Sequence, residues 1–209
     1  MGDFPHRVRV LNSHGGPLAQ THHWHSICSV IGVTRFFSRF MGVLVLDPLA
    51  FEEIEANRHA AMQSVIVVVL VCLAGGLAAM GLGLAGLSGF VIGTVVSLGA
   101  RLVWVSVLTA LGTIAMPERQ TSSDIPELLR VLGFASAPGV FIALAAMPPA
   151  APMIMAVVMP WTIAAAVVGV RQALDYRSLP RAVAVCVISW VLTFGVVMAA
   201  LMMFSQTVS

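Results

Sequence analysis

Apolar positions follow one another in runs that are too long for the core of a water-soluble domain. Residues 60–100, 131–170 and 182–209 contain no acidic or basic residue, and residues 60–116 hold only one, Arg101. About 20 consecutive apolar residues form a helix long enough to cross the hydrocarbon core of a bilayer. The stretches 60–116 and 131–170 are each roughly twice that length, so each must contain two helices.

Turn-forming residues indicate where the long runs break. Glycines interrupt "MGLGLAGLSG" (80–89), prolines interrupt "MPPAAP" (147–152), and polar segments occupy 117–127 and 171–181. The pattern predicts an all-α bundle of five transmembrane helices, followed by a short tail at 205–209. The expected helices cover about 60–82, 88–116, 127–147, 152–170 and 182–204.

A different pattern precedes the first crossing. In "VTRFFSRFMGVLVLDP" (33–48), phenylalanines recur near helical spacing while Arg35 and Arg39 fall on another face, which is typical of an amphipathic helix at the membrane interface. Asp47 is then an N-cap, Pro48 the first helical residue and Asn57 the stop of a short second helix. Residues 30–57 are therefore predicted to form interfacial helices.

The acids of this second helix, Glu52, Glu53 and Glu55, crowd one short element. A metal or acid–base site needs acids that converge from several elements into a pocket. We therefore interpret these acids as a solvated face.

Residues 1–29 are polar, rich in His and Gly, and without helical or strand periodicity, which favours a disordered tail. The opening residues lack the short apolar core of a secretory signal, so we do not expect a cleaved leader. An alternative interpretation is an over-extended start, with translation beginning near Val30 or Val33. His22, His23, His25 and Cys28 are weak candidates for a zinc or copper site, because their spacing matches no established zinc finger.

Composition narrows the classes of function. Hydrophobic residues make up 59% of the chain and charged residues 10%, against about a quarter charged in ordinary soluble domains. The formal net charge of +2 and the absence of a dense basic patch argue against a nucleic-acid partner. The membrane region has no histidine and no HExxH, GxSxG, P-loop or GxGxxG motif, so we expect neither an enzyme nor a cofactor.

Arginine positions predict the orientation. Ten of the eleven arginines fall before the first helix, or within or close to the second and fourth connections, while the turns near 83–88 and 148–152 and the tail carry none. Basic short loops remain on the cytoplasmic side, so the N-terminus is predicted inside and the C-terminus outside.

Arg101 is the one arginine outside these regions, and it lies in the apolar stretch "LGARLVWVSVL" (98–108). A cation near the bilayer centre costs about 2.5–3.5 kcal/mol on insertion scales, so it needs partners. Pro138 and Pro160 each remove a backbone donor, and we expect Arg101 to clamp the carbonyls of Phe134 and Ala156 that they release. The alternatives are snorkelling to a headgroup and a site for an anion or substrate.

Small residues indicate close helix packing. Gly89 and Gly93 in "GFVIG" fit the small-xxx-small pattern, and we expect them to pack inside the monomer rather than between copies. Trp104, Trp161 and Trp190 fall inside predicted crossings, which favours packing between helices over an interfacial belt.

The chain resembles bacterial members of the Yip1 family over roughly residues 33–204. The similarity lies in "VLVLDPLAFEEIEAN" before the first crossing, "ELLRVLGFASAPGVF" at the third and the five-crossing layout. It implies a multi-pass protein of the bacterial cytoplasmic (inner) membrane that organises membranes as a scaffold. Eukaryotic members associate with Rab GTPases, but this chain lacks their Asp-Leu-Tyr-Gly-Pro motif, so a Rab-type partner is not expected.

The leading functional hypothesis is a non-catalytic scaffold that contacts lipids, other membrane proteins or further copies of itself. The alternative is a small transporter or channel, since buried charge and proline-interrupted helices occur at transport sites. Against transport stand the lack of a visible repeat and the lack of an intramembrane acid for ion coupling.

Overall fold

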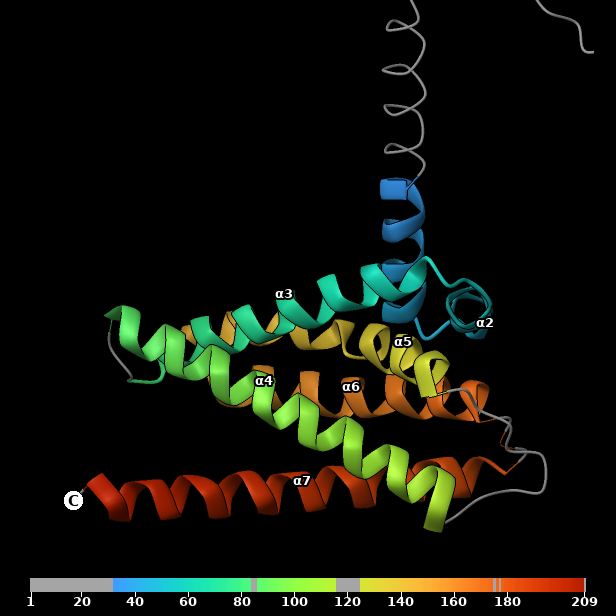
Figure 1. Ribbon diagram of the computed structural model, residues 1–209. Coiled ribbons are helices and arrows are strands. Elements are labelled where there is room, and N and C mark those ends of the chain that lie inside the picture. The colour runs from blue at the N-terminus through green and yellow to red at the C-terminus, as the bar shows by residue number, and fades with distance from the viewer. Residues whose placement is uncertain (1–31, 84–85, 116–124, 175, 177, 209) are drawn as a thin grey trace, which may run out of the picture. The chain divides into compact units, whose positions relative to one another are not determined.

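The computed structural model describes residues 32–83, 86–115, 125–174, 176 and 178–208 (Figure 1). These residues are almost entirely helical and include no strand, which confirms the predicted all-α helical bundle. The predictions for residues 1–29, including the candidate metal ligands His22, His23, His25 and Cys28, lie outside the described residues. Phe37–Ser209 forms one compact unit, and the contacts below all lie within it.

The N-terminal part of the described chain is helical over residues 32–44 and again in α2 (Pro48–Ala56). The predicted cap of α2 is confirmed, because the Asp47 side chain accepts a hydrogen bond from the Leu49 N–H at 3.0 Å. Asn57 ends the helix as expected. α2 is seen almost end-on in Figure 1, whereas α3 runs across the view, so the two helices cross rather than run alongside each other.

α3 (Ala60–Gly81) and α4 (Gly86–Ala110) form an antiparallel pair. Gly83 and Gly86 stand at the reversal with φ of +111° and +77°, a region that side chains with a Cβ rarely adopt. α4 continues as a π-helical turn, η1 (Leu111–Ala115), where the Tyr176 hydroxyl donates to the Gly112 carbonyl at 2.8 Å.

The third predicted helix is interrupted, which corrects the expectation of a single helix over 127–147. α5 (Ile125–Ala135) ends before Ser136, and the chain continues as a 3₁₀-helix, η2 (Ala137–Ala146). Pro138 lacks an N–H and disfavours the α-conformation at the residue before it, so it removes a hydrogen bond from the α-helical ladder at this point. Ala137, Pro138 and Gly139 are buried at this break.

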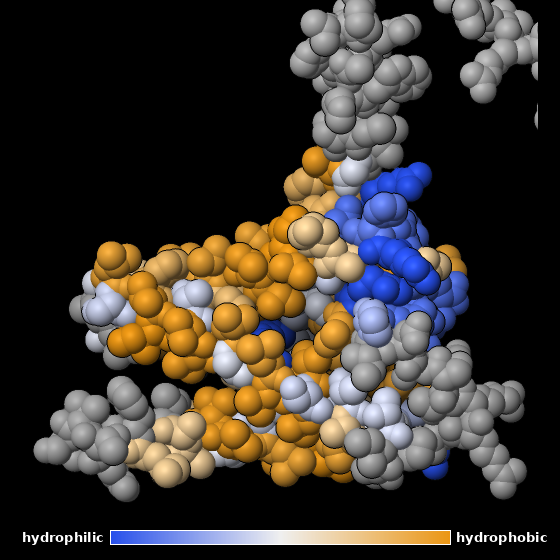
Figure 2. Space-filling view, viewed as in Figure 1, coloured by the Kyte–Doolittle hydropathy of each residue, from blue (hydrophilic) through white to orange (hydrophobic). Residues whose placement is uncertain are grey.

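The last two helices are longer than predicted. α6 (Ala151–Ala173) contains Pro160, and α7 (Leu179–Val208) extends beyond the expected 182–204 at both ends. Five segments of the described chain are long and apolar enough to cross a membrane: 60–81, 86–113, 126–146, 151–173 and 179–200. The chain is therefore a multi-pass membrane protein, and the apolar surface in Figure 2 suits a bilayer environment.

Candidate functional site

An apolar groove lies between α3, α4, α6 and α7. It holds a cavity of about 460 Å³, and Figure 2 shows the surface hollowed there, with hydrophilic atoms visible among apolar ones. Its walls carry few polar side chains and no described Asp or Glu. The larger and polar lining residues are Ser97, Arg101, Trp104, Ile142, Met155, Met159, Thr162, Trp190, Thr193 and Phe194.

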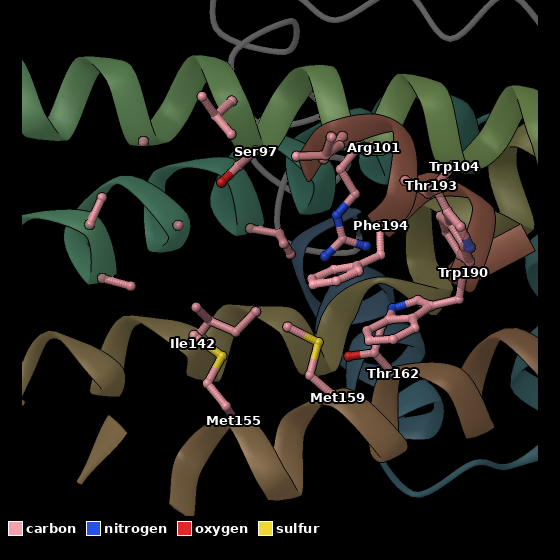
Figure 3. Close-up of a pocket in the computed structure, with 18 of the residues that line it drawn as sticks. Ser97, Arg101, Trp104, Ile142, Met155, Met159, Thr162, Trp190, Thr193 and Phe194 are labelled. Carbon is pink, nitrogen blue, oxygen red and sulfur yellow. The ribbon is translucent and has the colours of Figure 1, made fainter. Parts of the chain in front are cut away.

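Arg101 extends from α4 into this groove (Figure 3). Its guanidinium lies against Gly139 of η2, where an added Cβ would approach Nη2 to 2.7 Å. The carbon of the guanidinium is 6.0 Å from the ring centre of Trp104, the outer limit of a cation–π contact. Gly139 thus leaves the room that the cationic end of the side chain occupies.

The predicted clamp is wrong for the described part of the chain. Arg101 makes no hydrogen bond with any described residue, so the carbonyls of Phe134 and Ala156 are not its partners. Pro138 is buried beside Gly139, whereas Pro160 is exposed on α6 and does not line the groove. Pro138 therefore shapes the backbone near Arg101, whereas Pro160 does not contribute to the groove.

Trp104 contributes a second donor to the groove. Its side chain is only 7% exposed, and its indole Nε1 is buried without a hydrogen-bond partner in the described structure. Buried polar groups are normally paired, because an unpaired donor costs about 1–3 kcal/mol. The sequence indicated Trp104 only as a packing residue.

The hydroxyl groups of the groove are largely committed to their own helices. Thr162 donates to the Val158 carbonyl and Thr193 to the Ser189 carbonyl, each at 2.8 Å. Their oxygens can still accept, but neither carries a negative charge, so the Arg101 cation meets no described anionic group in this apolar groove.

Two pairs of aromatic rings stack in the bundle, and one of them, Trp190 and Phe194, lines the groove. Trp190 stacks on Phe194 of the same helix, with ring centres 6.0 Å apart. Trp161 stacks on Phe141 at 5.5 Å, and its Nε1 donates to the Leu44 carbonyl at 2.9 Å. The tryptophans thus pack between elements of the bundle, as the sequence suggested.

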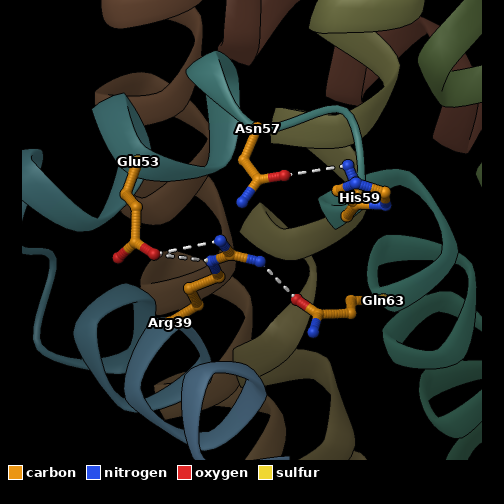
Figure 4. A network of polar contacts seen from close by, with 5 residues as sticks. All are labelled: Arg39, Glu53, Asn57, His59 and Gln63. Atoms are coloured by element: carbon orange, nitrogen blue, oxygen red, sulfur yellow. Dashed lines mark hydrogen bonds and ion pairs between the residues drawn. The ribbon is translucent and has the colours of Figure 1, made fainter. Parts of the chain in front are cut away.

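A separate polar network fixes the start of the bundle (Figure 4). Arg39 is 2% exposed and donates through Nε and Nη2 to one oxygen of Glu53, at 3.1 and 2.9 Å, and through Nη1 to Gln63 at 2.6 Å. Beside it, the Asn57 side chain accepts from the His59 N–H at 2.9 Å. The network joins α2 and α3 to the helical residues before them.

Glu52 and Glu53 are exposed, as the interpretation of a solvated face requires, and both also have partners in the chain. Glu52 accepts from the Gln172 side chain at 2.9 Å, and Arg130 donates to the Glu55 backbone carbonyl at 2.8 Å. Local periodicity gave no sign of these contacts, because the residues involved are 14 to 120 positions apart.

Gly89 and Gly93 are both buried in α4. A Cβ at Gly93 would lie 2.5 Å from the Ala79 Cβ and 3.1 Å from the Gly76 Cα, so this glycine allows α3 and α4 to approach closely within one chain. The described residues contain no cluster of His, Cys, Asp or Glu that could hold a metal ion.

No family model, curated protein or solved structure matches the chain. The assignment of function therefore depends on the residues and geometry described above.

Proposed function

We propose that the chain is a non-catalytic scaffold of Yip1 type that acts through lateral contacts within the membrane. The supporting observation is the open apolar groove between α4 and α7, together with the uncovered face of α4. Of the five spanning segments, α4 has the smallest share of residues buried inside the protein. Val95 and Leu102, seven residues apart on one face of this helix, are 62% and 63% exposed.

The same geometry favours lateral binding over passage of a solute. The groove walls are apolar apart from Arg101 and a few hydroxyl and indole groups, and no described acid lines them for proton or sodium coupling. The positions of the arginines in the sequence support a place in the cytoplasmic membrane of a bacterium with the N-terminus inside.

A small transporter is the second candidate, and a specific observation favours it. Arg101 is a cation that makes no hydrogen bond with a described residue, in a cavity between spanning helices, and intramembrane charge commonly marks a substrate path. A transporter would move solute without any protein partner.

Site-directed photo-crosslinking tests the scaffold proposal. A photoreactive residue at Val95 or Leu102 should give a discrete crosslinked species in native membranes, while the equally apolar Met153 of α6, 70% exposed, serves as the control position. The purified full chain should show no solute flux in liposomes. Flux without partners, or crosslinks equal at all three positions, would contradict a lateral scaffold.

A further inference from the structure

Arg101 lies near the middle of its spanning segment. The segment runs from Gly86 to Thr113, and at about 1.5 Å per residue Arg101 is about 22 Å from one end and about 18 Å from the other. The hydrocarbon core is about 30 Å thick, so with the segment centred in it Arg101 lies roughly 13 and 17 Å from its two surfaces.

The groove holds a cation without a described anionic partner. Arg101 makes no hydrogen bond with the described residues, Trp104 Nε1 is buried and unpaired, and no described carboxylate lines the cavity. A planar guanidinium binds two oxygens through parallel N–H groups, and it gains most from an anion in an apolar surrounding. The occupant that this charge requires is therefore an anion.

The rest of the cavity lining is apolar, so it suits an anion that also has an apolar part. Met155, Met159 and Phe194 line the cavity, whose volume of about 460 Å³ falls within the range of small-molecule sites. Methionine adapts to flexible chains because it is unbranched and polarisable. A ligand with an anionic end and a long hydrocarbon body fits both features.

A carboxylate satisfies this site better than a phosphate. Its two oxygens match the two parallel N–H groups of Arg101, whereas a phosphate carries further oxygens that need donors. Few donors remain for them, because Thr162 and Thr193 donate to their own backbones. Unpaired phosphate oxygens in this apolar groove would be costly.

We propose that the groove binds a long-chain fatty acid from the bilayer, with its carboxylate on Arg101 and its chain along α6 and α7. The inference rests on the proposed function, because it specifies the lipid class of a lateral contact. Arg101 is then a binding residue, and Gly139 positions it by leaving room for the guanidinium.

Quenching of tryptophan fluorescence provides the test, because Trp104 and Trp190 line the groove. The full chain is reconstituted in phosphatidylcholine vesicles and titrated with 9,10-dibromostearic acid, its methyl ester and brominated phosphatidylglycerol. We expect saturable quenching by the acid alone. Non-saturable quenching, equal quenching by the ester, or preferential quenching by the phosphatidylglycerol would overturn the proposal.

Four variants separate binding from folding. Arg101→Met should raise the apparent Kd for the acid at least tenfold, while Arg171→Met, which removes an exposed arginine of α6, should leave it unchanged. Arg101→Lys keeps the charge but loses the two-pronged contact, and Val197→Phe narrows the apolar wall with the charge intact. Both should weaken binding several-fold in folded protein, and wild-type affinity in both would refute the site.

The outcomes for the fatty acid and for the scaffold are distinguishable. Crosslinks at Val95 and Leu102 without acid binding would remove this inference and retain the proposed function. Saturable acid binding that depends on Arg101, combined with solute flux in the same vesicles, would retain the site and reject the scaffold.

Discussion

Arg39 and Arg101 place the same guanidinium group in different surroundings. Arg39 is buried, yet its donors meet Glu53 and Gln63 from two other helical segments. Arg101 faces an apolar groove, with the ring of Trp104 6.0 Å from its guanidinium carbon and no hydrogen bond to a described residue. The first arrangement completes a structural contact within the chain, whereas the second leaves the guanidinium without a hydrogen bond to a described residue.

Replacement of Arg39 tests its structural role. Arg39→Met should lower the free energy of unfolding in detergent by about 1–3 kcal/mol, because it leaves the Gln63 and Glu53 oxygens without their donor. The loss stays below that of a fully buried pair because the Glu53 side chain is 49% exposed and can regain water. Thermal unfolding followed by size-exclusion chromatography measures the change.

Arg35→Met is the matched control, since Arg35 is exposed four residues earlier on the same helical stretch. Equal melting temperatures for the two variants would show that the Arg39 network does not stabilise the bundle.

At the scale of elements, small residues and prolines decide how closely the helices pack. α3 and α4 approach through Gly93, Gly76 and Ala79, and the chain changes from α-helix to 3₁₀-helix at Ser136, ahead of Pro138. The change places Gly139 beside the Arg101 guanidinium. Backbone geometry in η2 is thus coupled to the shape of the groove.

A single methyl group tests the α3–α4 contact. Gly93→Ala should destabilise the protein by about 1–3 kcal/mol, because the new Cβ would overlap Ala79 and the helices would have to separate. Gly99→Ala, on the same helix with nothing within 4 Å of its Cβ, should instead be neutral or stabilise by about 0.5–1 kcal/mol. Thermal melts of both variants in one detergent provide the comparison, and similar destabilisation by both would argue against close packing at Gly93.

At the scale of the whole molecule, the length of the uncharged runs predicted the five spanning segments, because the cost of charge in a bilayer constrains sequence strongly. The cap at Asp47 was also predictable, since it depends on adjacent residues. A disturbance at Pro138 was expected from the sequence, but the change to a 3₁₀-helix after Ser136 was not, because the apolar run continued through the proline.

The contacts of the candidate site were not predictable from local pattern. The sequence singled out Arg101 as unusual, but its neighbours Gly139 and Trp190 come from distant segments of the chain. The lack of a described carboxylate in the groove is a property of the fold, and the same holds for the burial of Arg39, whose periodicity matched that of exposed Arg35. Side-chain pairing between separate helices carries no periodic signature.

Five crossings place the two ends of the spanning region on opposite sides of the membrane, and cysteine accessibility tests this most directly. In a variant with Cys28, Cys72 and Cys186 replaced by alanine, single cysteines are introduced at Ser123, in the second connection, and at Ser209. With a membrane-impermeant maleimide on sealed vesicles, we predict that one of the two positions is labelled and the other is labelled only after permeabilisation. Labelling of both positions from the same side would contradict the five-crossing account.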